Sequence, residues 1–117
     1  MKNILLLENS KTIYIILSKY LNDIYPNKFS IELVKTHKEF IEKLHSRTTS
    51  IDIIFSNRGV NNINLIKALN QSKHFNNIPI VLLTTDIEEE IEENTQINEI
   101  LGKPFTKELL KDTLDRL

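Results

Sequence analysis

Five short apolar runs, separated by longer stretches with helical spacing, constrain this 117-residue chain more than any other feature. The runs occupy residues 4–7, 31–34, 51–55, 78–83 and 100–101. They lack strict alternation of apolar and polar residues, which is typical of strands buried on both faces of a parallel sheet. Because parallel strands need crossover connections, the helical stretches between the runs are expected to cover both faces. The sequence therefore predicts five successive strand–helix units.

The stretches between the runs carry their own helix signals. The first helical face is formed by residues at i, i+3, i+4, i+7, i+8 and i+11: Ile13, Ile16, Leu17, Tyr20, Leu21 and Ile24. Pro26 ends this helix, since the residue before a proline is pushed out of the α region. Thr36 with Glu39 predicts the start of the second helix, and Thr106 the start of the last one. Asp86 gives a weaker signal for the fourth helix. The remaining apolar faces are marked by Ile63, Ile66 and Leu69 for the third helix, and by Leu109, Leu110, Leu114 and Leu117 for the last.

Together these elements predict one domain spanning residues 1–117. We expect a doubly wound, flavodoxin-like α/β fold with five helices around a five-stranded parallel sheet of order 2-1-3-4-5. In such sheets, ligands bind beyond the carboxyl ends of the strands. The side chains expected there are Glu8, Asn9, Ser56, Asn57, Thr84, Thr85 and Lys103.

Composition excludes several function classes. The formal net charge of −1 provides no basic field for nucleic acid or for an anionic membrane. The absence of cysteine excludes disulfides and thiol chemistry. No apolar stretch approaches the roughly 20 residues of a membrane span, so the cytoplasm is the expected compartment. With only two glycines, the chain has no glycine-rich phosphate loop, which argues against a nucleotide or flavin binder. We therefore predict no cofactor.

Four sequence blocks resemble the signature blocks of response regulator receiver domains, the CheY-like fold. They occupy residues 5–10, 52–57, 79–84 and 102–105 and follow one another in the family's order along the whole chain. The block Lys103-Pro104-Phe105, with Thr84 before it, is the most specific part of the resemblance.

The resemblance implies a phosphorylation site that has lost its chemistry. In a working receiver, two acidic residues after the first strand and an aspartate after the third bind Mg²⁺, and that aspartate accepts a phosphoryl group. Glu8 falls at the first acidic position, Asn9 at the second and Asn57 at the phosphoacceptor. Mg²⁺ is normally anchored by carboxylates, and an acyl phosphate forms only from a carboxylate. We therefore predict a chain that is not an enzyme, holds no metal and is not phosphorylated on aspartate.

Three other positions of the family, two retained and one altered, suggest a domain that keeps one conformation and does not switch. Thr84 and Lys103 fall at the positions of the family's phosphoryl-binding hydroxyl and ammonium. We hypothesise that Glu8 pairs with Lys103 while Asn9 and Asn57 form hydrogen bonds around the pair. Ile100 falls at the switch position, where receivers usually have an aromatic residue. The alternative is an unorthodox phosphoacceptor at Glu8, or at Ser56 if the block is shifted by one residue.

The resemblance points to a pseudo-receiver that works by binding proteins. We expect a phosphorylation-independent interaction or dimerisation module of bacterial signal transduction, acting as the regulatory domain of a transcriptional regulator. The domain itself is expected to contact neither nucleic acid nor membrane. A homodimer is expected to form through the fourth helix, fifth strand and fifth helix. The residues expected on this partner face are Glu88, Glu89, Glu92, Lys107, Lys111 and Arg116. The alternative for the acidic run is a solvated helix face.

Overall fold

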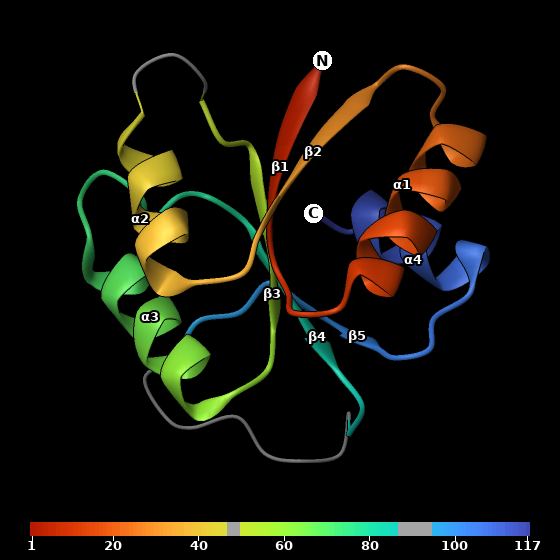
Figure 1. Cartoon of the computed structure of the whole chain (residues 1–117). Coiled ribbons are helices and arrows are strands. Elements are labelled where there is room, and N and C mark those ends of the chain that lie inside the picture. Colours follow the sequence, from red (N-terminus) through yellow and green to blue (C-terminus); the bar gives the residue numbers. More distant parts are fainter. Residues whose placement is uncertain (47–49, 87–94) are drawn as a thin grey trace.

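A five-stranded parallel sheet with helices on both faces forms the centre of the computed structural model, which describes residues 1–46, 50–86 and 95–117 (Figure 1). The strands are β1 (Lys2–Leu7), β2 (Phe29–Val34), β3 (Ile53–Asn57), β4 (Ile80–Thr84) and β5 (Glu99–Gly102). Their order is β2-β1-β3-β4-β5, and every neighbouring pair is parallel. The predicted sheet and its order are confirmed.

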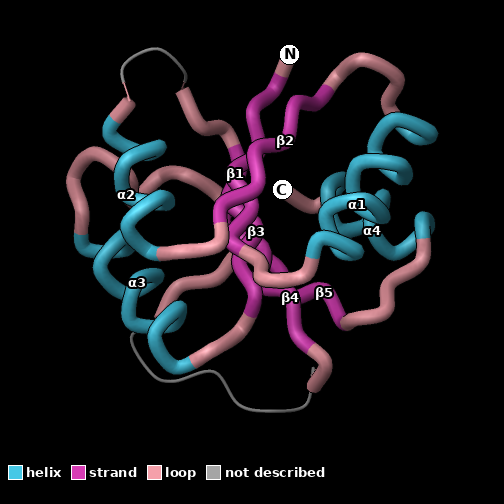
Figure 2. Tube along the Cα trace, viewed as in Figure 1, coloured by secondary structure: helices cyan, strands magenta, loops and turns pink. Residues whose placement is uncertain are grey.

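The described segments contain four helices, α1 (Lys11–Ile24), α2 (His37–His45), α3 (Val60–Gln71) and α4 (Lys107–Asp115) (Figure 2). The helix labelled α4 is therefore the fifth helix predicted from the sequence. The helix expected after Asp86 falls on residues 87–94, outside the described residues. Thr36 and Thr106 cap α2 and α4 as predicted, each accepting a backbone N–H three residues on. None of these helices is long and apolar enough to cross a membrane, within the part of the chain that is described.

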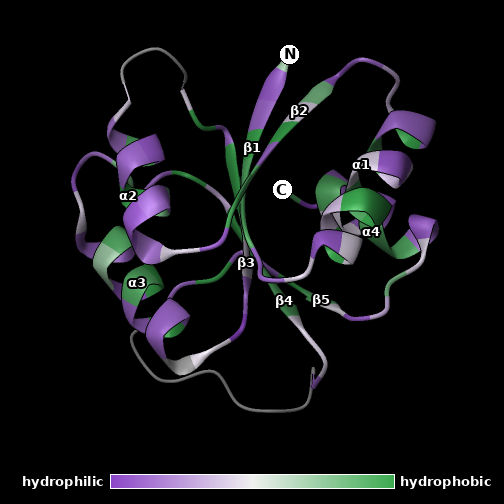
Figure 3. Ribbon diagram, viewed as in Figure 1, coloured by the Kyte–Doolittle hydropathy of each residue, from purple (hydrophilic) through white to green (hydrophobic). Residues whose placement is uncertain are grey.

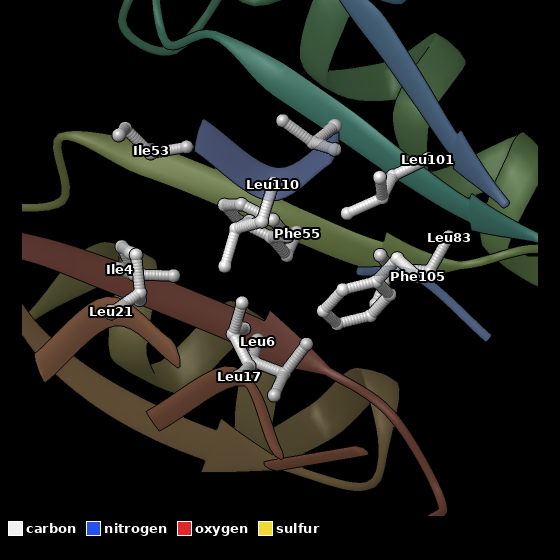
Figure 4. Packing of buried hydrophobic residues seen from close by; sticks show 11 residues of the cluster. Ile4, Leu6, Leu17, Leu21, Ile53, Phe55, Leu83, Leu101, Phe105 and Leu110 are labelled. Atoms are coloured by element: carbon white, nitrogen blue, oxygen red, sulfur yellow. The ribbon is translucent and has the colours of Figure 1, made fainter. Parts of the chain in front are cut away.

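The helices form two layers, with α1 and α4 on one face of the sheet and α2 and α3 on the other (Figure 1). Successive strand residues point to opposite faces, so each strand supplies both cores. Leu6 packs in the cluster under α1 and α4, whereas Leu5 packs in the cluster under α2 and α3. Figure 4 shows the first cluster, in which Leu17 and Leu110 from the helices meet Phe55 from β3. The strands are mostly apolar where helices cover both faces, whereas β1 begins with polar residues and the edge strand β2 is mixed (Figure 3).

The apolar face predicted for the last helix is partly wrong. Leu110 is fully buried, but Leu109 is 51% exposed and Leu117 lies beyond the helix end. Thr113, three residues after Leu110 and on the same face, is buried instead. Its hydroxyl donates to the Leu109 carbonyl at 2.8 Å, which satisfies its polar atom and allows burial.

Candidate functional site

The residues predicted to flank the strand ends do gather at one edge of the sheet. Glu8 follows β1, Asn57 ends β3, Thr84 ends β4 and Lys103 follows β5. The ends of β4 and β5 are in register, since Thr84 is opposite the last residue of β5, and Asn57 at the end of β3 is opposite Leu83. The backbone N–H of Lys103 also donates to the Thr84 carbonyl at 2.7 Å. The strand ends therefore bring Glu8, Asn57 and Lys103, which are far apart in sequence, into direct contact.

Lys103 is the centre of this group of side chains, which is called the pocket below. Its Nζ lies 3.2 Å from Glu8 Oε2 and 2.9 Å from Asn57 Oδ1. The side chains of Lys103 and Glu8 are only 15% and 3% exposed, so the ion pair is largely shielded from water. An ammonium has donors and no acceptor, so the Asn57 amide must present its oxygen to Lys103. Asn57, rather than Ser56, is thus the residue that meets the lysine.

Both oxygens of Glu8 are engaged. While Oε2 faces Lys103, Oε1 accepts from the backbone N–H groups of Asn9 at 3.0 Å and Ser10 at 3.2 Å. Ser10 is the N-cap of α1, so the carboxylate lies at the positive end of a helix dipole. Asn9 contributes its backbone to this arrangement, and its side chain is exposed.

The hydroxyls of Thr84 and Ser56 form hydrogen bonds with backbone groups one or two residues further along the chain. Thr84 Oγ1 accepts from the backbone N–H of Asp86 at 3.1 Å and donates to the carbonyl of the same residue at 3.3 Å. Ser56 is 2% exposed, and its hydroxyl donates to the Asn57 carbonyl at 3.1 Å. Both hydroxyls therefore hold the chain at the strand ends.

Sequence reasoning missed a second set of contacts at this edge. Asn62, in the first turn of α3, donates from Nδ2 to the Asn57 carbonyl at 2.7 Å. Its Oδ1 then faces His37 Nε2, also at 2.7 Å, so that ring nitrogen carries the proton. A small depression of about 140 Å³ lies over these side chains, and its wall includes Asn9 and Asn61. His37 follows β2 at the same sheet edge, a position from which topology alone could have identified it.

The donor set does not fit the magnesium site that the resemblance would otherwise imply. Mg²⁺ is usually anchored by one or two carboxylates together with water and phosphate oxygens. Here Asn9 and Asn57 are amides, and both Glu8 oxygens already accept hydrogen bonds from the protein. Consistent with this, the described residues include no group of three or more acidic or histidine side chains placed to hold a metal ion.

The predicted partner-face cations contact carboxylates of their own domain. Lys107 lies 2.8 Å from Asp23, Lys111 lies 2.7 Å from Asp115, and Arg116 pairs with Glu99. The hydrogen bond with Asp23 raises the pKa of Lys107 above its usual value, and the one with Asp115 does the same for the pKa of Lys111. The acidic residues of the predicted face, Glu88, Glu89 and Glu92, lie outside the described residues. The homodimer face thus stays a prediction from sequence.

Ile100 occupies β5, where it pairs with Leu82 of β4. It is 37% exposed, while its neighbour Leu101 is buried in the core under α1 and α4. Ile100 therefore points to the opposite face of the sheet from that core. An aliphatic side chain at this place has no polar tip that could form a hydrogen bond in one of two positions.

Comparison with solved structures identifies the fold. CheY4 of Vibrio cholerae, a chemotaxis protein, is 25% identical with a TM-score of 0.80, covering 99% of this chain and 98% of that one. The signal receiver domain of a DNA binding response regulator from Colwellia psychrerythraea is 18% identical with a TM-score of 0.82, covering 99% and 97%. That of a signal transduction histidine kinase from Syntrophus aciditrophicus is 21% identical with a TM-score of 0.76, covering 99% and 89%.

Comparison with protein-family models and with curated protein sequences gives no match. The structural similarity nevertheless extends over the whole chain and over most of each neighbour. The chain therefore has the fold of the CheY-like receiver domains of response regulators.

Proposed function

We propose that this chain is a pseudo-receiver, which takes part in signal transduction by binding a protein partner and is not switched by aspartyl phosphorylation. The observation that carries the proposal is the contact of Lys103 Nζ with both Glu8 and Asn57. One carboxylate and one ammonium balance each other, and a neutral amide fills the phosphoacceptor position. The charges of the pocket are therefore balanced without a metal ion or a phosphoryl group.

The geometry argues against the two unorthodox phosphoacceptors. Glu8 is 3% exposed, and both of its oxygens are engaged by an ammonium and by backbone N–H groups. Ser56 is 2% exposed, and its hydroxyl is directed at the neighbouring carbonyl. A phosphoryl donor would have to displace these contacts before reaching either oxygen.

The wider context follows from the receiver fold. Structural neighbours include the receiver domain of a DNA binding response regulator, which supports the regulatory domain of a bacterial transcriptional regulator as the setting. In that role the domain would act in the cytoplasm, have no catalytic activity and leave DNA contact to another part of its protein. Partner binding would use one standing conformation of the domain.

Phosphorylation is tested by incubating the protein with Mg²⁺ and a small phosphodonor such as acetyl phosphate, followed by intact-mass analysis. We expect no phosphoryl adduct on the wild type. The double variant Asn9→Asp/Asn57→Asp restores the carboxylates and should gain the mass of one phosphoryl group, which shows that the assay works. A phosphoryl adduct on wild-type Glu8 or Ser56 would overturn the proposal.

Self-association is tested by analytical ultracentrifugation over a range of protein concentrations. Replacement of Glu88, Glu89 and Glu92 by lysine should shift a homodimer toward monomer. Glu42→Lys is the matched control, because that exposed glutamate lies on α2. An oligomeric state that none of these changes alters would reject the acidic run as the dimer contact.

A further inference from the structure

We propose that Lys103 and Asn57 are built to join through an intramolecular amide bond, with Glu8 moving the proton. The proposal assigns a self-modification site to the pocket, and it stands independently of which partner the domain binds. It rests on three side chains of complementary chemistry: an amine, a carboxamide and a carboxylate.

The nucleophile and the electrophile are already in contact. Lys103 Nζ donates to Asn57 Oδ1 at 2.9 Å, which places the amine beside the carbonyl whose carbon it would attack. Holding two reacting groups in this way replaces a bimolecular encounter by a unimolecular step. Folding has already brought these two residues, which are 46 positions apart, into contact, so the reaction itself loses little further conformational entropy.

The Glu8 carboxylate is placed to act as a general base on the Lys103 amine. Glu8 Oε2 lies 3.2 Å from Lys103 Nζ, within reach of its proton. The other oxygen is fixed by the backbone N–H groups of Asn9 and Ser10, so that the carboxylate is held in one orientation. A base thus touches the group that would attack and is itself oriented by further hydrogen bonds, which is the geometry that proton removal from a nucleophile requires.

The reaction balances without an added reagent. Glu8 takes a proton from the ammonium of Lys103, and the free amine attacks Cγ of Asn57. The attacking nitrogen gives up its second proton as the Cγ–Nδ2 bond breaks, and the leaving nitrogen takes up both protons, one of them from Glu8. It departs as ammonium, and Glu8 is again a carboxylate. One amide bond replaces another, no electron is transferred, and the chain loses one ammonia.

Burial and anchoring favour the amine over water as the attacking group. The side chains of Lys103 and Glu8 are 15% and 3% exposed. The backbone of Asn57 is held through its carbonyl by Asn62, and the backbone of Lys103 by the Thr84 carbonyl. Such a bond would tie the end of β3 to the residue after β5 across the end of β4.

The test is the intact mass of the wild-type protein under denaturing conditions, followed over days of incubation. We expect a progressive loss of one ammonia. Trypsin releases residues 48–58 and 74–107 as separate peptides from the unlinked chain, since Lys103 precedes Pro104 and is spared. In the product these two peptides should run as one branched species whose fragmentation locates the bond at Asn57 and Lys103.

Two variants separate this reaction from its competitors. Lys103→Arg keeps the cation but should abolish the loss of ammonia, and Glu8→Gln should slow it at least tenfold; circular dichroism checks that both fold. A loss that persists in Lys103→Arg would mean cyclisation of Asn57 with its own backbone, and would overturn the proposal. So would a gain corresponding to hydrolysis of Asn57 to Asp, or a wild-type mass that stays unchanged.

Discussion

The buried ion pair makes a quantitative prediction about stability. Lys103→Met removes the ammonium while keeping an apolar stem of similar length. The Glu8 carboxylate, 3% exposed, would then lack its cation and keep only its two backbone N–H donors. Breaking a buried pair from one side costs about 3–5 kcal/mol, and the remaining donors place this case at the lower end. We expect a loss of about 3 kcal/mol in the unfolding free energy, or about 10 °C in Tm.

The opposite change should cost less. Glu8→Gln leaves the ammonium of Lys103 with the oxygen of Asn57 and with partial access to water, because that side chain is 15% exposed. The expected loss is about 1–2 kcal/mol. In the double variant no unpaired carboxylate remains, so its loss should fall short of the sum of the single losses by about 1–2 kcal/mol.

The wild type, the two single variants and the double variant form a double-mutant cycle, and urea unfolding measures the stability of each. Intact mass confirms that each sample has the mass of its sequence and therefore no linked side chains. Lys111→Met is the matched control, since Lys111 and Asp115 form an ion pair whose side chains are 52% and 49% exposed. That substitution should leave the unfolding free energy unchanged within error, because exposed ion pairs are screened by water. Strictly additive losses at Glu8 and Lys103, or equal effects at Lys103 and Lys111, would refute the reasoning.

Three further predictions concern α4 and its contacts. Leu110→Ala should cost about 2–5 kcal/mol in chemical unfolding, whereas Leu109→Ala should cost under about 0.5 kcal/mol, since their exposures are 0% and 51%. Thr106→Ala should lower stability by about 1 kcal/mol through loss of the N-cap, seen as a lower Tm. The hydrogen bonds from Lys111 and Tyr25 lower the pKa of Asp115. The Asp115 carboxylate therefore stabilises the fold at pH values above its ordinary pKa of 3.8, and this stabilisation is lost as the pH falls through the lowered pKa. In melting curves recorded over a range of pH, Asp115→Asn should remove this loss of stability.

Most of the fold could be predicted from sequence because buried parallel strands are apolar on both faces. The five runs, the strand order and the caps at Thr36 and Thr106 all follow from that pattern and from capping chemistry. The last helix was harder, because leucines at adjacent positions define two competing faces. Which face is buried was decided by packing against α1 and β5, and by the ability of Thr113 to hydrogen bond within its own helix.

The site was predicted less completely. Topology brought Glu8, Asn57 and Lys103 together, but it could not show that Asn57 faces the lysine through its oxygen, which depends on side-chain geometry. The contact between His37 and Asn62 was not predicted, because it depends on how α2 and α3 place these two side chains at the sheet edge. The hydroxyl of Thr84 was given a ligand-binding position by resemblance, whereas its hydrogen bonds are with the backbone of its own turn.

The amide at position 57 explains the charge balance around Lys103. A largely buried ammonium needs one carboxylate to balance it, and Glu8 supplies that charge to Lys103. A second carboxylate, at position 57, would give these three side chains a net charge of −1, so that the folded state would require another cation. An amide keeps the oxygen that Lys103 needs as an acceptor and removes the charge, as the 2.9 Å contact with Asn57 shows. The amide therefore leaves the Glu8–Lys103 pair electrically balanced, and it sets beside the lysine a carbonyl that an amine can attack.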